Sequence, residues 1–132
     1  MILVDTSVLI DFFRDISNPK SEKFHEILVN QIPFGITSLI YQEILQGAKD
    51  ESEFDKLKEY LGCQKFYYPE DDIHSYEEAA KMYYSLRKKG ITVRSAIDCL
   101  IVQIAKENNL SLLHNDKDYD KLVEIAEVSV FE

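Results

Sequence analysis

Short apolar runs alternate along this chain with longer segments whose apolar residues recur at helical spacing. Five runs predict β-strands, at residues 2–4, 33–37, 63–68, 111–114 and 125–131. The segments between them predict helices, at residues 8–13, 19–30, 39–46, 50–61, 69–90, 96–105 and after 116. Strands separated by helices pair in parallel, because a parallel connection needs a crossover. The pattern therefore predicts an α/β fold in three layers, α/β/α, with a central parallel sheet of about five strands.

The length of 132 residues is that of one ordinary domain, and no Pro- or Gly-rich linker divides the chain, so we expect a single domain over residues 1–132. Met1 leads directly into the first strand without a basic segment or cleavage site, and no apolar run is long enough to cross a membrane. We therefore expect a cytoplasmic protein. Cys63 and Cys99 both have apolar neighbours, and we expect two buried free thiols.

The formal net charge of -9 argues against a protein that coats nucleic acid electrostatically, because that mode of binding depends on clustered Lys and Arg. The charge is compatible with an acidic site that holds cations. Arg87, Lys88 and Lys89, with Arg94 a few residues later, form the best local candidate for a nucleic-acid contact. The same run also fits a solvated helix end whose cations complement the helix dipole.

Four acidic residues occupy positions that favour apolar or capping side chains. Asp5 directly follows the first expected strand, and Asp116 lies just beyond the fourth. Glu43 lies on the helix after the second strand, and Asp98 interrupts the apolar side of its helix. In open parallel sheets, ligands bind beyond the carboxyl ends of the strands. We therefore expect these four carboxylates to converge at that edge.

Each acid also has a structural explanation. Asp5 and Asp116 can cap helices, Glu43 can pair with a Lys, and Asp98 can complement the dipole at its helix start. All four together are harder to explain this way, because like charges repel unless a cation or a shared proton compensates. Clustered carboxylates without Cys or His ligands suit Mg²⁺ or Mn²⁺ better than zinc.

Four segments carry a resemblance to a known family, namely VDTSVLID, ITSLIYQEILQG, SAIDCLIVQIA and LLHNDKDYDKL. With these segments the chain resembles the PIN domain from end to end, and within it the VapC-type toxin ribonucleases of toxin–antitoxin pairs. The resemblance implies a PIN-like fold and four metal-binding, catalytic acids, which are Asp5, Glu43, Asp98 and Asp116. Asp118 is a further candidate ligand, and Thr6 and Ser7 would position Asp5 or a metal-bound water. The family pattern T-x-D-x-D-F is HNDKDY here, so His114 stands where Thr or Ser is usual.

The implied function is metal-dependent hydrolysis of phosphodiester bonds in RNA, with tRNA or another structured RNA as substrate. Mg²⁺ would be the cofactor, and Mn²⁺ could substitute for it. The resemblance further implies a cognate antitoxin. We also expect a homodimer and, from the basic run of the sequence, RNA contacts at Arg87, Lys88, Lys89 and Arg94. An antitoxin could silence such a site by inserting one Arg or Lys among the four acids.

Two other interpretations stay open at this point. The chain could be a PIN nuclease that acts in RNA processing or nucleic-acid-linked regulation without being a toxin. A more remote alternative is a non-catalytic α/β module that binds Mg²⁺, such as a response-regulator-like receiver. Receivers, however, group adjacent acids after the first strand and use a Lys at the last strand end, and this sequence has neither feature.

Overall fold

The computed structural model describes all residues from 1 to 132. Its centre is a parallel sheet of four strands in the order β3-β2-β1-β4. The strands are β1 (Ile2–Val4), β2 (Phe34–Thr37), β3 (Lys65–Tyr67) and β4 (Ser111–Leu113). The parallel α/β architecture expected from the sequence is therefore confirmed.

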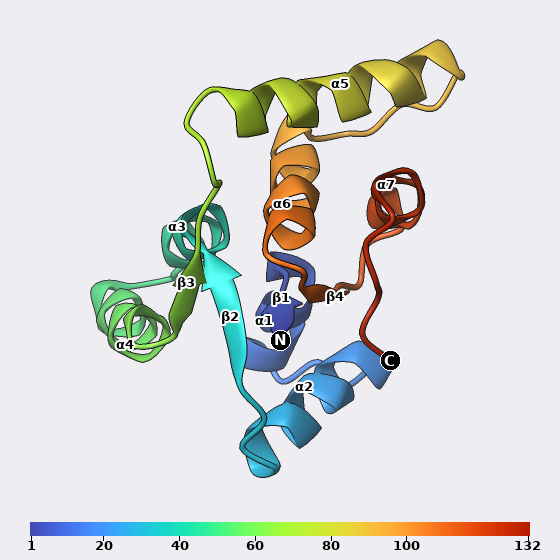
Figure 1. Cartoon of the computed structure of the whole chain (residues 1–132). Coiled ribbons are helices and arrows are strands. Elements are labelled where there is room, and N and C mark those ends of the chain that lie inside the picture. The colour runs from blue at the N-terminus through green and yellow to red at the C-terminus, as the bar shows by residue number, and fades with distance from the viewer.

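Helices cover both faces of this sheet. They are α1 (Thr6–Phe13), α2 (Pro19–Val29), α3 (Ser38–Gln46), α4 (Glu51–Gly62), α5 (His74–Lys88), α6 (Ala96–Glu107) and α7 (Asp118–Ala126). Every residue of β1 and β2 is buried, and successive side chains of a strand point to opposite faces, so neither face is open to solvent. α5 packs on α6 and α6 on α7, whereas α1 packs on α2 and α3. Figure 1 shows α5 and α6 on one side of the strands and α2 on the other.

The sheet has four strands, so the expectation of a fifth strand at residues 125–131 is wrong. Ile125 and Ala126 belong to the last turn of α7, whose buried side chains follow helical spacing. The helix ends at Glu127, which adopts the left-handed conformation with φ 58°. After this turn only Val130 pairs with β4, in a single parallel bridge to Leu112. The segment after the helix therefore adds one bridge to the sheet and no fifth strand.

The start of α5 also differs from the sequence expectation. Residues 69–73 precede the helix as a turn, in which the Asp71 carboxylate accepts hydrogen bonds from the backbone N–H groups of Ile73 and His74. The Glu107 carboxylate of α6 holds the same segment by accepting from the Glu70 N–H at 2.9 Å and from the Ser75 hydroxyl at 2.7 Å. These side-chain acceptors take up N–H groups at the beginning of the segment, and α5 starts only at His74.

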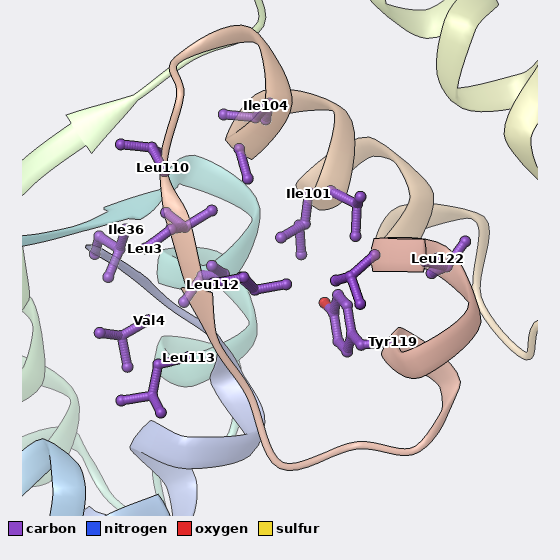
Figure 2. Packing of buried hydrophobic residues seen from close by; sticks show 14 of the residues in the cluster. Leu3, Val4, Ile36, Ile101, Ile104, Leu110, Leu112, Leu113, Tyr119 and Leu122 are labelled. Carbon is purple, nitrogen blue, oxygen red and sulfur yellow. The ribbon is translucent and has the colours of Figure 1, made fainter. Parts of the chain in front are cut away.

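The core lies between the sheet and its helices. Figure 2 shows Leu3 of β1, Leu112 of β4 and Ile101 of α6 within one cluster of buried side chains. Cys99 belongs to this core, as expected, but Cys63 is exposed at the carboxyl end of α4; both thiols are free. None of the helices combines the length and the hydropathy that a membrane crossing requires.

Gly35 of β2 gives a test of this packing. A Cβ atom at Gly35 would lie 2.8 Å from the Lys65 carbonyl oxygen and closer still to the Tyr67 ring, whereas one at Gly47 would meet nothing nearer than 3.6 Å. We expect Gly35→Ala to lower the free energy of unfolding by about 1–3 kcal/mol, because overpacking forces neighbouring atoms to move. Gly47→Ala is the control and should change it by less than about 0.5 kcal/mol. Urea titration measures both, and equal stabilities would contradict the packing described here.

Candidate active site

Asp5 is a buried carboxylate at the carboxyl end of β1, with 4% of its surface exposed. It is the N-cap of α1, and its Oδ2 accepts hydrogen bonds from the Ser7 N–H at 3.0 Å and the Ser7 hydroxyl at 2.7 Å. Its Oδ1 accepts from the Tyr119 hydroxyl at 2.7 Å. The helix starts at Thr6, two residues earlier than the sequence suggested, because Asp5 caps it. Protein donors satisfy this buried charge.

Asp98 lies in the first turn of α6, which Ser95 caps through a hydrogen bond from the Ile97 N–H. Its Oδ1 is 3.2 Å from the Tyr119 hydroxyl. Burial raises the pKa of Asp98 to about 6, and the negative charges of Asp5, Asp116 and Glu43 act in the same direction. All four predicted acids are thus brought together, with Asp98 close enough to the other three to be repelled by each.

Glu43 approaches the cluster from α3. Its Oε1 accepts a hydrogen bond from the Thr6 hydroxyl at 3.2 Å. Partial burial raises the pKa of Glu43, and the charge of Asp5 adds to this effect. Thr6 and Ser7 therefore have separate roles, since Ser7 holds Asp5 and Thr6 holds Glu43.

Asp116 and Asp118 are both paired with Arg94. The Arg94 Nη2 lies 3.0 and 3.1 Å from the two carboxylate oxygens of Asp116, and its Nε donates to Asp118 Oδ2 at 2.8 Å. This guanidinium holds the pKa of Asp118 below its ordinary value. Arg94, a predicted RNA contact, thus lies at the acidic cluster with its side chain 75% exposed.

His114 is buried behind this loop, with 5% of its surface exposed. Its Nδ1 accepts a hydrogen bond from the Asp116 N–H at 3.3 Å, which places the proton of the neutral ring on Nε2. Burial lowers the pKa of His114, so the ring is neutral at pH 7. His114 therefore supports the backbone that carries Asp116 and does not itself enter the cluster of acids.

Tyr119 is the residue at this site that sequence reasoning missed. It is fully buried on α7, and its hydroxyl contacts both Asp5 and Asp98. Burial and these two carboxylates raise the pKa of the Tyr119 phenol far above its ordinary value, so the hydroxyl keeps its proton and acts as a donor. The available signal was the last residue of HNDKDY, where the family pattern has a Phe without a hydroxyl.

The predicted basic contacts Arg87, Lys88 and Lys89 lie at the carboxyl end of α5, which Figure 1 shows projecting beyond α6. All three are exposed. The Arg87 guanidinium lies 6.0 and 5.9 Å from the ring centres of Tyr83 and Tyr84, and the Lys88 ammonium lies 5.3 Å from that of Tyr84. The end of α5 thus combines cations with an exposed aromatic ring.

The donors at the cluster are carboxylate oxygens, which suit a hard divalent cation. As they stand, no three acidic, His or Cys side chains are arranged around a common point that could hold an ion. The Tyr119 hydroxyl contacts Oδ1 of Asp5 and Oδ1 of Asp98, and Arg94 donates to both carboxylate oxygens of Asp116. The chemistry of the donor set fits a metal, and ligation by three of these side chains requires them to move closer together.

Comparison with known proteins agrees with this architecture. The profile of the PIN domain matches residues 2–125, and the chain therefore belongs to the PIN-domain family. It is 30% identical over 127 residues, 96% of this chain and 94% of the relative, to the VapC ribonuclease Mb1587 of Mycobacterium bovis and to ribonuclease VapC11 of Mycobacterium tuberculosis. The resemblance to VapC ribonucleases noted in the sequence is thus confirmed.

Solved structures share the fold at low sequence identity. VapBC-1 from nontypeable Haemophilus influenzae matches with a TM-score of 0.73 and 19% identity, covering 100% of this chain and 98% of that one. VapBC2 from Rickettsia felis, bound to a DNA fragment of its promoter, matches with a TM-score of 0.72 and 18% identity, covering 99% and 98%. The PIN-like arrangement of sheet and helices is therefore common to these proteins.

The raised pKa of Asp98 predicts how stability depends on pH. The native state holds the Asp98 proton up to about pH 6, whereas an unfolded chain releases it near the ordinary value of 3.8, so this group destabilises the fold increasingly as pH rises between these values. Asp98→Asn removes this effect. We expect the variant to be more stable than the parent above pH 6 and equal to it near pH 4.

Urea midpoints from pH 4 to 8 in EDTA measure this difference. Asp55→Asn, at an exposed position on α4, is the control with the same loss of charge. A stability difference between Asp98→Asn and the parent that stays constant with pH would contradict the prediction.

Proposed function

We propose that this protein is a divalent-metal-dependent endoribonuclease that acts as the toxin of a toxin–antitoxin pair. One observation carries the proposal: Asp5 and Asp98 come from separate segments and share the Tyr119 hydroxyl at the carboxyl end of β1, and Glu43 and Asp116 add to the negative charge around Asp98. Such a concentration of carboxylates is costly for folding and suits the binding of cations. The named ribonucleases among its relatives support the choice of RNA as substrate.

Asp5, Glu43, Asp98 and Asp116 would hold Mg²⁺ or Mn²⁺, with Asp118 as an additional ligand. The bound ion would lower the pKa of a water for attack on the phosphodiester and neutralise developing charge. The chain's own residues fix the ligands, since Ser7 fixes Asp5 and Thr6 orients Glu43. Burial and the neighbouring acids raise the pKa of Asp98 to about 6 in the metal-free protein, and a bound cation would favour its ionised form. This chemistry needs no protein nucleophile.

Cleavage of total tRNA by the purified protein tests the activity. We expect cleavage in Mg²⁺ or Mn²⁺, none in EDTA, and a loss of about 100-fold or more in Asp98→Asn, because a ligand should matter at least as much as its supporting groups. Asp98 is a sharper choice than Asp5, where an amide would also disturb the cap of α1. The control Asp55→Asn should cleave like the parent, and cleavage that persists in EDTA would contradict metal dependence.

The RNA would extend from the acids toward the end of α5. Arg87, Lys88 and Lys89 offer cations and Tyr84 an exposed ring for stacking on an unpaired base. We expect Lys88→Glu to raise the KM for RNA about 3–10-fold with kcat unchanged, since a phosphate contact contributes to binding alone. Lys56→Glu, with the same change of charge on α4, is the control. Equal KM values for the two variants would contradict this contact.

The antitoxin would act at the same acids. Arg94 shows that a guanidinium fits among carboxylates of this cluster, where it bonds Asp116 and Asp118. A basic side chain from the antitoxin would bind Asp5, Glu43 and Asp98 in the same way, and the net charge of -9 would speed its approach. We further propose a homodimer, which sedimentation at several concentrations would detect.

Mixing this protein with the product of the neighbouring reading frame tests the toxin assignment. We expect a stoichiometric complex that no longer cleaves tRNA in Mg²⁺. Changing the inserted Arg or Lys of the partner to Ala should restore cleavage. If the complex cleaves as fast as the free protein, the toxin assignment is wrong and a PIN nuclease of RNA processing remains.

A further inference from the structure

Tyr119 joins two of the acids through one atom. It lies in the first turn of α7 with 1% of its surface exposed, and its ring packs 5.0 Å from that of His114. Figure 2 shows the ring inside the buried cluster, with its oxygen on the side away from α7. The core therefore fixes where this hydroxyl can lie, independently of the acids.

The hydroxyl lies 2.7 Å from Asp5 Oδ1 and 3.2 Å from Asp98 Oδ1. A phenol has a single proton, and the shorter contact has the length of an O–H···O⁻ hydrogen bond, so Asp5 is the main acceptor. The longer contact is the weaker arm of a shared hydrogen bond. Asp5 Oδ1 and Asp98 Oδ1 both contact the Tyr119 hydroxyl oxygen. The distance between these two carboxylate oxygens therefore cannot exceed the sum of the two contact distances.

The other oxygen of Asp5 is already engaged, since Oδ2 accepts both hydrogen bonds from Ser7. A carboxylate has about four lone-pair positions, and three of those on Asp5 are used. The position left for a cation is therefore on Oδ1, next to the Tyr119 hydroxyl. Asp98 presents its own Oδ1 to the same hydroxyl.

We propose that Tyr119 is a positioning residue of the metal site, whose hydroxyl holds Asp5 Oδ1 and Asp98 Oδ1 close enough together to bind one divalent cation. The inference rests on the proposed function in requiring that these acids bind a metal. Without the hydroxyl, the buried carboxylate of Asp5 and the half-buried one of Asp98 move apart to reduce their repulsion, and metal binding must then bring them back together. The hydroxyl thus raises metal affinity by preorganising the ligands.

Titration calorimetry of the RNA-free protein with MnCl₂ tests this inference. Tyr119→Phe keeps the ring in the core and removes only the oxygen. We expect its Kd for Mn²⁺ to rise about 10-fold, in the range found for groups that orient metal ligands. Half-maximal cleavage of tRNA should likewise require about 10-fold more Mn²⁺ in the variant than in the parent.

Tyr41→Phe is the matched control. It removes a hydroxyl that donates to the Lys58 carbonyl oxygen at 3.4 Å, between α3 and α4 and away from the acids, so its Kd should equal that of the parent. Melting in EDTA shows whether each variant is folded.

An unchanged or lower Kd in Tyr119→Phe, or a variant that does not fold, overturns the inference, because the hydroxyl would then compete with the ion or serve the fold alone. A parent that binds no Mn²⁺ overturns the metal-dependent function as well. If the parent binds Mn²⁺ but cleaves no RNA, only the proposed ribonuclease activity fails.

Discussion

The carboxylate of Asp5 is buried at the end of β1, one of the two inner strands of the sheet, and several neighbouring groups satisfy its charge. Ser7 and Tyr119 donate three hydrogen bonds to its two oxygens. Its backbone N–H donates to the Leu113 carbonyl oxygen at 2.9 Å and ties β1 to β4. A buried charge without such partners would cost several kcal/mol or more. Asp5 therefore links β1, α1, β4 and α7 at one point.

The other acids are held by neutral or cationic partners of their own. Thr6 donates to Glu43, and Arg94 pairs with Asp116 and Asp118. Asp98 has only a shared contact with the Tyr119 hydroxyl, and its pKa is raised to about 6. Burial is the main cause of this shift, and the negative charges of Asp5, Asp116 and Glu43 add to it.

The fold is shared with solved structures that are less than a fifth identical in sequence, which shows how few residues the architecture requires. His114 and Tyr119 differ from the family pattern described for the HNDKDY segment, and their rings contact each other. One supports the backbone N–H of Asp116, and the other bonds Asp5 and Asp98. The two departures therefore lie together, directly behind the acids.

Local pattern was enough to predict four strands, the order of the helices and the convergence of four acids. The buried face of each helix or strand repeats apolar residues at the spacing of that element, and the carboxyl ends of parallel strands lie at one edge of the sheet. Local pattern failed at residues 125–131, where apolar residues suit a strand and a helix equally, and packing against α6 selected the helical turn. Sequence also could not assign the partners of the acids. The bond between Tyr119 and Asp5 joins residues 114 positions apart, and Arg94 reaches Asp116 across 22. Such contacts depend on distances between elements, and only the tertiary structure sets these distances.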